Sequence, residues 1–415
     1  MRAEVGAETT LRRSSAGGPA AARAPLPSSK RFLSLADFEA AARRRLPRPL
    51  FEFVAGAAEE NASLAANRAA FARYALIPRV LRDVTNRSSR VTVLDRQYDL
   101  PVGIAPMGIC AMTGYRGDIA MARAAEQARI PMILSGSSLI PLEEVIAHHP
   151  TAWFQAYIPG EPAAIRALLD RVRNAGYQTL VVTADVPLSG NRENNIRSGF
   201  SLPLRPTPSL AWQGLTHPRW LLGTALRTLL NHGMPHFENA GATRGAPVLS
   251  KRALREFNAR DRLDWSHLRL VRQLWTGRLV VKGILSPYDA VAARDCGADG
   301  LIISNHGGRQ LDGAIAPLRV LARIVDAVSG LPVMLDGGVR RGTDVLKAMA
   351  LGATLVFVGR PFNYAAAVAG EAGIAHAVRI LAEEIGRDMA LMGLNRLDEI
   401  GPADIEPVDT TVEPR

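Results

Sequence analysis

Cysteine is scarce in this chain. Only Cys110 and Cys296 occur among 415 residues, and they stand too far apart to suggest a metal site or a disulfide framework. Such use of cysteine is typical of reducing compartments, so the sequence predicts a cytoplasmic location. Long apolar stretches are missing as well. Without a run of 18 apolar residues, a membrane-spanning helix is not expected.

Acidic residues are also in short supply. The chain has 39 Asp and Glu against 50 Lys and Arg, which gives a formal net charge of +11. A basic excess suits nucleic acid, an anionic membrane surface or anionic substrates as partners. Because no nucleic-acid motif and no basic stripe with interleaved aromatic residues occurs, we do not expect nucleic acid to bind.

Residues 1–30 consist mostly of Ala, Gly, Ser, Pro and Arg, with Glu4 and Glu8 the only acids. This composition predicts a disordered tail. Because no apolar stretch follows Arg12-Arg13, a twin-arginine export signal is not expected, whereas an organelle transit peptide stays open.

From residue 31 onward, short apolar segments alternate with helical patterns. This alternation predicts a parallel sheet, and eight units predict an α/β fold, a closed (β/α)8 TIM barrel with an N-terminal helical segment. The expected barrel domain covers 31–406 and leaves a C-terminal tail at 407–415. The predicted strands are 102–106, 131–135, 152–157, 179–185, 279–283, 300–304, 332–336 and 355–359, with helices at 117–129, 161–175, 286–296 and 342–351 between them.

The spacing breaks once, between the fourth and fifth strands. Residues 189–262 are therefore expected to form a long loop insertion over the active site. Within it, 201–252 is basic, with Glu238 the only acid, and includes Trp212 and Trp220. Such a segment suits an anionic lipid surface, which predicts a peripheral contact with the inner face of a membrane. A lid whose tryptophans pack over the substrate is the alternative.

The most informative stretch is residues 301–313, Leu-Ile-Ile-Ser-Asn-His-Gly-Gly-Arg-Gln-Leu-Asp-Gly. Its apolar start predicts a buried strand, and its continuation places His306 and Arg309 on the loop where that strand ends. Histidine can exchange a proton near neutral pH, and arginine can hold a carboxylate through two parallel hydrogen bonds. The pair therefore suits proton abstraction next to a carboxylate.

In barrel enzymes the site lies at the carboxyl ends of the strands. Strands seven and eight end in glycine-rich turns with an arginine each, which predicts a phosphate site. A buried Lys282 would need a partner, and an electron-rich cofactor ring would serve; a Schiff-base lysine is the alternative. Asp185 is expected to orient His306, unless it caps a helix. The strand-end candidates are Pro106, Met107, Gly108, Ser135, Gln155, Tyr157, Thr183, Asp185, Arg192, Lys282, Ser304, His306, Arg309, Asp336, Gly337, Gly338, Arg340, Gly359 and Arg360.

The string at 301–313 resembles the signature of the FMN-dependent 2-hydroxy-acid oxidases and dehydrogenases, such as glycolate oxidase, lactate dehydrogenase and mandelate dehydrogenase. The resemblance extends over about residues 35–405 and includes Trp153-Phe154-Gln155-Ala156-Tyr157. It implies FMN as the cofactor, no metal, and a homotetramer.

The resemblance also implies roles for the strand-end residues. His306 would be the catalytic base and Asp185 its partner, and Tyr157 would lie near the substrate hydroxyl. Arg309 and Arg192 would bind the substrate carboxylate. All strand-end candidates other than Asp185, Tyr157 and Arg192 would contact FMN.

Two departures from the family pattern concern the substrate. Where the family usually has a tyrosine that binds the substrate carboxylate, this chain has Phe53. Where plant-type glycolate oxidases have a tryptophan after strand two, it has Gly136-Ser137. Phe53 is therefore assigned to the substrate-binding set, in a pocket expected to admit a bulkier or differently oriented substrate.

The leading prediction is FMN-dependent oxidation of an L-2-hydroxy acid, lactate-like or mandelate-like, to the 2-oxo acid. Electrons are expected to pass to a quinone or a carrier; Gly108 favours this, because family oxidases often have alanine there. The alternatives are an oxidase that uses oxygen, a relative that acts on a peptide or an amine, and a non-redox flavin isomerase or plain phosphate-binding barrel. The set of His306, Arg309 and Asp185 argues against the isomerase and the phosphate-binding barrel.

Overall fold

The structure is a computed structural model and describes residues 31–408 except 202, 206 and 251–259. The predicted tail at 1–30 lies outside the described residues. Three helices come first, in agreement with the predicted N-terminal helical segment. They are α1 (Leu35–Arg45), α2 (Arg48–Ala55) and α3 (Ala62–Ala72).

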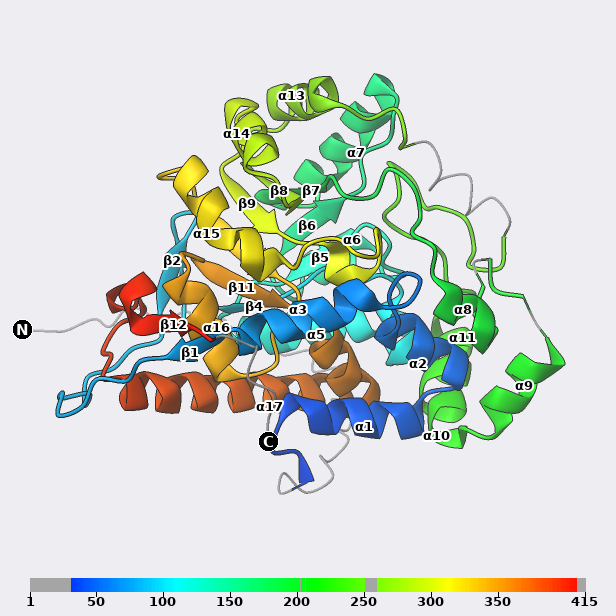
Figure 1. Ribbon diagram of the computed structural model, residues 1–415. Coiled ribbons are helices and arrows are strands. Elements are labelled where there is room, and N and C mark those ends of the chain that lie inside the picture. Colours follow the sequence, from blue (N-terminus) through cyan, green and yellow to red (C-terminus); the bar gives the residue numbers. More distant parts are fainter. Residues whose placement is uncertain (1–30, 202, 206, 251–259, 409–415) are drawn as a thin grey trace, which may run out of the picture.

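An eight-stranded parallel sheet forms the body of the molecule (Figure 1). Neighbouring strands pair in chain order from β5 to β11, and β4 pairs with β11. A single parallel bridge, between Ile104 and Met132, closes the remaining seam. All eight predicted strands and the (β/α)8 barrel are thus confirmed. The strands are β4 (Val102–Ile104), β5 (Ile133–Ser135), β6 (Trp153–Ala156), β7 (Thr179–Thr183), β8 (Arg278–Ile284), β9 (Gly300–Ile303), β10 (Val333–Asp336) and β11 (Leu355–Val358).

Helices surround the barrel (Figure 1). Four of them, α7, α14, α15 and α17, have a proline in the first turn, where the missing N–H costs nothing. The four helices expected from sequence are α5, α7, α14 and α16. The outer helices are α5 (Gly117–Ala128), α6 (Leu142–Ile146), α7 (Pro162–Asn174), α13 (Trp265–Leu274), α14 (Pro287–Asp295), α15 (Pro317–Ala327), α16 (Gly342–Ala350) and α17 (Arg360–Met392).

The helix α17 is long and apolar enough to cross a membrane by length and composition. It packs against α1, α5 and α16, and more than half of its most apolar window is buried. Its backbone also departs from helical geometry at Ala369 and Gly370. These contacts identify α17 as a core helix of the barrel wall.

Side chains fill the barrel interior. Val181, Val280 and Ile302 point inward from consecutive strands and belong to one buried cluster. Trp153, at the start of β6, donates its indole N–H to the Tyr98 hydroxyl at 3.3 Å. Tyr98 lies on the hairpin of β2 (Val91–Val93) and β3 (Arg96–Tyr98), so this hairpin covers the amino-terminal end of the barrel. The carboxyl end is left for a site.

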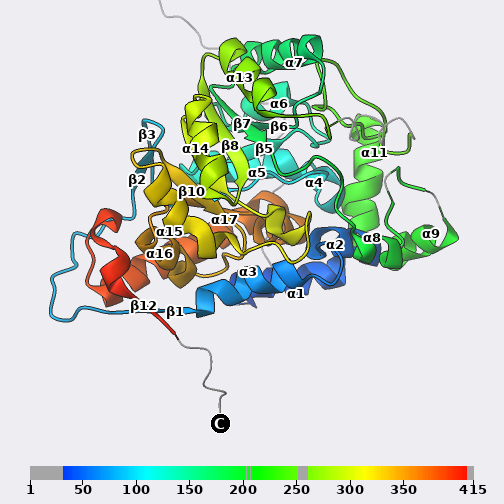
Figure 2. The same cartoon turned by 45° about the horizontal axis from the view of Figure 1, so that its top comes forward.

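Between β7 and β8 the insertion contains a series of short helices, all of the described ones before residue 233. Its elements are α8 (Glu193–Ser198), α9 (Pro208–Leu215), α10 (Pro218–Trp220), the π-helical η2 (Leu221–Leu226) and α11 (Arg227–His232). In both views α9 and α11 lie together on one side of the barrel (Figures 1 and 2). The Trp220 indole donates to Met112 O at 2.8 Å, which ties the segment to α4 (Cys110–Thr113).

The end of the described chain returns to its beginning. The strand β12 (Ile405–Pro407) pairs antiparallel with β1 (Tyr74–Leu76). This pairing includes Pro407, the first residue of the predicted C-terminal tail. Three short 3-10 turns complete the list: η3 (His306–Gly308), η4 (Leu397–Glu399) and η5 (Pro402–Asp404).

Candidate active site

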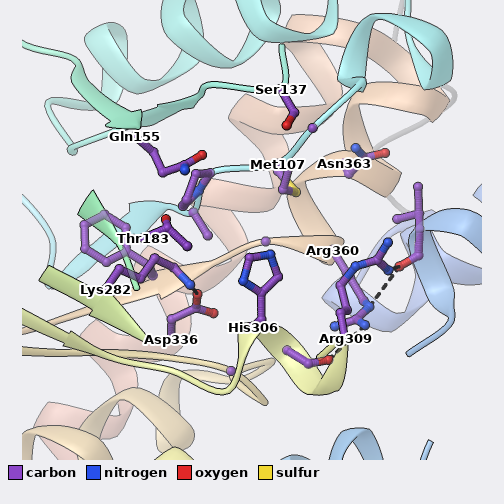
Figure 3. A pocket seen from close by; sticks show the side chains of 18 of the residues that line it. Met107, Ser137, Gln155, Thr183, Lys282, His306, Arg309, Asp336, Arg360 and Asn363 are labelled. Carbon is purple, nitrogen blue, oxygen red and sulfur yellow. Dashed lines mark hydrogen bonds and ion pairs between the residues drawn. The ribbon is translucent and has the colours of Figure 1, made fainter. Parts of the chain in front are cut away.

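A cavity opens at the carboxyl ends of the strands, where the sequence placed the site (Figure 3). It brings together side chains from all parts of the barrel and from the N-terminal segment. Seventeen predicted residues line it: Phe53, Pro106, Met107, Gly108, Gln155, Tyr157, Thr183, Arg192, Lys282, His306, Arg309, Asp336, Gly337, Gly338, Arg340, Gly359 and Arg360.

Three predicted residues do not line the cavity but contact residues that do. Asp185 lies behind His306. Ser135 donates to Gln155 Oε1 at 3.0 Å, and Ser304 accepts from the Lys282 ammonium at 2.8 Å. For these residues, the structure supports an indirect role through their neighbours.

His306 and Asp185 form a pair. His306 Nδ1 and Asp185 Oδ1 are 3.0 Å apart, although the residues follow β9 and β7. Gly283, on the strand between them, makes this possible: a Cβ there would lie 2.6 Å from the Asp185 side chain. Asp185 is therefore a partner of the imidazole, as predicted, and the helix-cap alternative is not needed.

The pair has shifted proton affinities. Burial lowers the pKa of His306 below its usual value, while Asp185 counteracts this. Burial raises the pKa of Asp185, but the interactions with His306 and Lys282 outweigh it, so the pKa lies below its usual value. A neutral imidazole beside an ionised carboxylate is the arrangement of a general base.

The backbone that carries His306 is unusual. His306, Gly307 and Gly308 all have positive φ angles, of 58°, 64° and 76°. A histidine rarely adopts this left-handed conformation, and a side chain at position 308 would lie 2.7 Å from Leu64 N. This tight turn aims the imidazole into the cavity.

Lys282 already has protein partners. It is 3 % exposed, and its ammonium lies 2.8 Å from Asp336 Oδ2 and from Ser304 Oγ. Burial disfavours the charge, but Asp336 and Asp185 raise the pKa above its usual value. The expectation that a cofactor ring would be the partner of Lys282 is thus incomplete. A protonated lysine is also a poor nucleophile, which argues against a Schiff base.

Several buried polar atoms face the cavity without a partner. Among the described residues, Gln155 Nε2, Thr183 Oγ1 and Asn363 Oδ1 have no hydrogen bond. All three side chains line the cavity (Figure 3). Unpaired buried polar groups are costly, so these three atoms are expected to have a partner in the working protein. A planar ligand with amide and carbonyl groups could form hydrogen bonds with them. The isoalloxazine ring of FMN fits this requirement.

Cations and glycines gather at the other end of the cavity. Arg340 and Arg360 line it next to the turns at Gly338 and Gly359. Burial and the nearby Arg360 lower the pKa of Arg340 to about 10. A Cβ at Gly338 would lie 2.3 Å from Asn67 O, so the turn requires glycine. Gly359 also caps α17, whose first N–H groups favour an anion. The FMN phosphate fits here.

The remaining wall can hold a substrate. Arg309 donates to Phe53 O and Gly56 O at 2.8 Å, and its guanidinium lies 5.0 Å from the Phe53 ring centre. Arg192 donates to Arg309 O at 3.2 Å. The Phe53 ring packs 4.5 Å from the Phe200 ring. An apolar surface thus adjoins two cations.

Sequence reasoning missed several lining residues, among them Phe237, Arg260 and Asn363. Arg260 is buried and its guanidinium lies 4.1 Å from the Tyr157 ring centre. Burial raises the pKa of Tyr157, and Arg260 opposes this rise. Arg260 lies in the insertion, where no periodic pattern marks it. Asn363 lies one helical turn after Arg360, and that spacing could have revealed it.

The chain is similar to several known proteins. Residues 42–407 match the FMN-dependent dehydrogenase family. The L-lactate dehydrogenase of Stenotrophomonas maltophilia (strain R551-3) is 39% identical over 374 residues, which cover 88% of this chain and 96% of that protein. The (S)-mandelate dehydrogenase of Pseudomonas putida is 36% identical over 375 residues, which cover 90% and 94%. The crystal structure of the monotopic membrane protein (S)-mandelate dehydrogenase has a TM-score of 0.85 at 34% identity and covers 91% of this chain and 100% of that one.

Proposed function

The chain belongs to the FMN-dependent dehydrogenase family, and on this premise we propose that it oxidises an L-2-hydroxy acid to the corresponding 2-oxo acid. Relatives named for lactate and mandelate support this substrate class. The observation that carries the proposal is the pairing of His306 with Asp185 in a cavity that also holds Arg309 and Arg192. Bound FMN supplies the two-electron acceptor.

The chain's own residues divide the work. The substrate loses two electrons and two protons: His306 takes one proton, the other hydrogen passes with the electrons to the bound cofactor, and Asp185 stabilises the imidazolium that forms. The Lys282 cation, held by Asp336, favours negative charge on a reduced cofactor. Gln155 and Thr183 would bind the ring, and Arg340 and Arg360 the phosphate. Tyr157 would contact the substrate hydroxyl.

We propose a substrate with a bulky apolar side chain, closer to mandelate than to lactate. Phe53 lacks the hydroxyl that would bind a small acid, and it forms an aromatic wall with Phe200. Phe237 and Val186 extend the apolar lining of the cavity. Arg309 and Arg192 are left to bind the carboxylate by charge and by two-pronged hydrogen bonds.

The test is anaerobic bleaching of the bound flavin by a panel of L-2-hydroxy acids with small, branched and aromatic side chains. We expect aromatic and branched acids to bleach the flavin faster than lactate and glycolate. The D-enantiomers are the matched controls. Bleaching by amines or peptides and by no hydroxy acid would replace the proposal with its main alternative.

For the electron acceptor, we propose a quinone reached by peripheral contact with a membrane through the insertion. Trp212, Leu222 and Leu230 are 65 %, 63 % and 84 % exposed on α9, η2 and α11. Apolar side chains on a basic segment suit the surface of an anionic bilayer. That the structurally similar (S)-mandelate dehydrogenase is described as monotopic supports the same reading. The contact would lie on the inner face of the membrane.

Vesicle binding and reoxidation kinetics test this part. The protein should sediment with anionic vesicles and be released by salt, and a quinone analogue should reoxidise its flavin faster than air-saturated buffer. Rapid peroxide formation without vesicle binding would indicate an oxidase with a soluble lid. The homotetramer implied by the resemblance stays a prediction, to be checked by the mass of the native protein in solution.

A further inference from the structure

A second cavity lies outside the active site, between α1 and the insertion. It has a volume of 720 Å³, within the range of about 300–1,000 Å³ typical of ligand pockets. One wall comes from the end of α1 and the other from the connection between α9 and α10. In Figure 1 α10 lies beside α1, at the lower edge of the barrel. The lining includes Phe32, Asp37, Arg44 and Arg45 on the side of α1 and Arg219 on the side of the insertion.

Positive charge predominates in this cavity. Arg44 and Arg45 face Arg219 across it. Burial and the neighbouring Arg219 both lower the pKa of Arg45. Within the described chain, Arg45 and Arg219 form no ion pair with an acid. Asp37 is the one acid of the lining, and its Oδ2 already accepts hydrogen bonds from Leu33 N, Ser34 N and Ser34 Oγ. The arginines therefore retain donors for an anion.

Part of the lining of the cavity is apolar. Phe32, Ala41 and Val368 belong to this part. On the insertion, the lining residues 216–219 lie between exposed Leu215 on one side and exposed Leu222 on the other. A ligand with a phosphate next to hydrocarbon would match both parts, whereas free phosphate would use only the arginines.

We propose that this cavity binds the phosphate headgroup of an anionic phospholipid, with Arg45 and Arg219 as its ligands. The proposal rests on the membrane contact proposed above and adds a defined lipid site to it. An arginine can bind a phosphate through two parallel hydrogen bonds, which need a fixed geometry. General attraction between a basic segment and a charged surface needs no such geometry. The lipid would fix the insertion against α1, and thereby fix the orientation of the barrel on the membrane.

Matched double variants separate a site from diffuse attraction. Arg45→Gln with Arg219→Gln removes two charges from the cavity. Arg43→Gln with Arg205→Gln removes two charges from the same two segments, at positions that do not line it. Both pairs should weaken binding to phosphatidylglycerol vesicles, since each basic residue near the surface contributes. We expect the cavity pair to bind about tenfold more weakly than the control pair. Arg45→Lys with Arg219→Lys, which keeps the charge, should weaken binding as well.

A soluble lipid tests the site without a bilayer. Calorimetric titration of the intact holoprotein with dihexanoylphosphatidylglycerol, below its micelle concentration, should show binding that the cavity pair loses and the control pair keeps. Inorganic phosphate and dihexanoylphosphatidylcholine at the same concentration should bind much more weakly. Equal binding of inorganic phosphate would overturn the lipid assignment.

The failures are distinguishable. If the native chain does not bind phosphatidylglycerol vesicles, both the membrane contact and the lipid site are refuted. If the native chain binds vesicles but both double variants lose affinity equally, the contact stands and the site is refuted. Unchanged FMN content and thermal unfolding would show that the variants fold.

Discussion

Two regions of this molecule depart from the usual distribution of side chains in opposite directions. At the mouth of the barrel, charged groups such as Lys282 and Asp185 are enclosed. On α9, η2 and α11, apolar groups such as Leu222 and Leu230 are exposed. Buried charges need partners, and exposed apolar clusters mark contacts. Lys282 and Asp185 find their partners within the protein, and it is the unpaired Gln155 Nε2 and Thr183 Oγ1 beside them that leave bonds for a cofactor. The exposed apolar groups are those on which the proposed lipid contact rests.

The regions also differ in how firmly they are built. The mouth is held by short bonds between strands, such as those of Lys282 with Asp336 and of His306 with Asp185. Among the described residues, α9 to α11 are attached to the rest of the protein mostly through exposed groups: Arg48 N donates to Gln213 Oε1 at 3.3 Å, and Tyr115 and Arg116 contact His232, beside the bond from the Trp220 indole. Chemistry requires fixed geometry, whereas contact with a fluid surface does not.

The strongest loss of activity is expected for His306→Ala, in the enclosed region. It should lower the rate of flavin reduction by about 10²–10⁴-fold or more, because it removes the base, while FMN stays bound. Anaerobic stopped-flow absorbance measures the rate, and the flavin spectrum reports the bound cofactor. Reduction at a near-normal rate would remove His306 from its role.

The insertion is tested by Leu222→Asp, with Leu391→Asp as its control. The two leucines are 63 % and 66 % exposed, but Leu391 lies on α17. We expect the insertion variant to bind anionic vesicles roughly 100-fold more weakly, because a buried leucine contributes about 1.5–3 kcal/mol and a carboxylate is repelled. Flavin reduction should be unchanged in both. Equal vesicle binding by the two variants would contradict a membrane contact at η2.

Phe53→Tyr tests whether residue 53 lies where the substrate carboxylate binds, between the apolar and the charged wall of the cavity. A hydroxyl near Arg309 should strengthen the binding of small hydroxy acids about 10- to 100-fold, because a hydrogen bond to a charged group contributes about 1.5–3 kcal/mol. The substrate dependence of flavin reduction measures the affinity. Should affinity for lactate and glycolate stay the same or fall, Phe53 does not occupy the carboxylate-binding position.

The smallest expected effect is a shift in pH dependence. The pKa of His306 lies below its usual value, so kcat/KM should rise with pH below about 6.5 and level off at neutral pH, where the base is deprotonated. Asp185→Asn removes a group that raises the pKa of His306. The rise should therefore move to lower pH, with a lower plateau because the base is weaker. A profile that moves to higher pH would contradict this account of the pair.

Much of the barrel and its site could be predicted from sequence. Buried parallel strands such as 300–303 are continuous apolar runs, and the residue after each run falls at the barrel mouth. This logic located His306, Arg309 and Gln155. It could not reveal that Asp336 pairs with Lys282, because both strand ends offered charged residues and the partner depends on side-chain direction.

The insertion could be predicted only as a basic, aromatic segment. Its helices are short, and no apolar periodicity fixes which side packs against the barrel. Hence Arg260, which reaches the Tyr157 ring, was missed. The second cavity was equally hidden, since α1 and α10 are far apart in the chain and meet only in the folded protein.

The seam of the barrel determines when the barrel can close during synthesis. On one side β4 pairs with β11 through three residue pairs, and on the other a single bridge, Ile104 to Met132, joins it to the segment that leads into β5. A ribosome releases β4 long before β11. The first strand therefore waits, with one edge unprotected, until nearly the whole barrel has emerged, and closure becomes a late event. Nascent chains stopped before residue 355 should be the ones that chaperones hold longest.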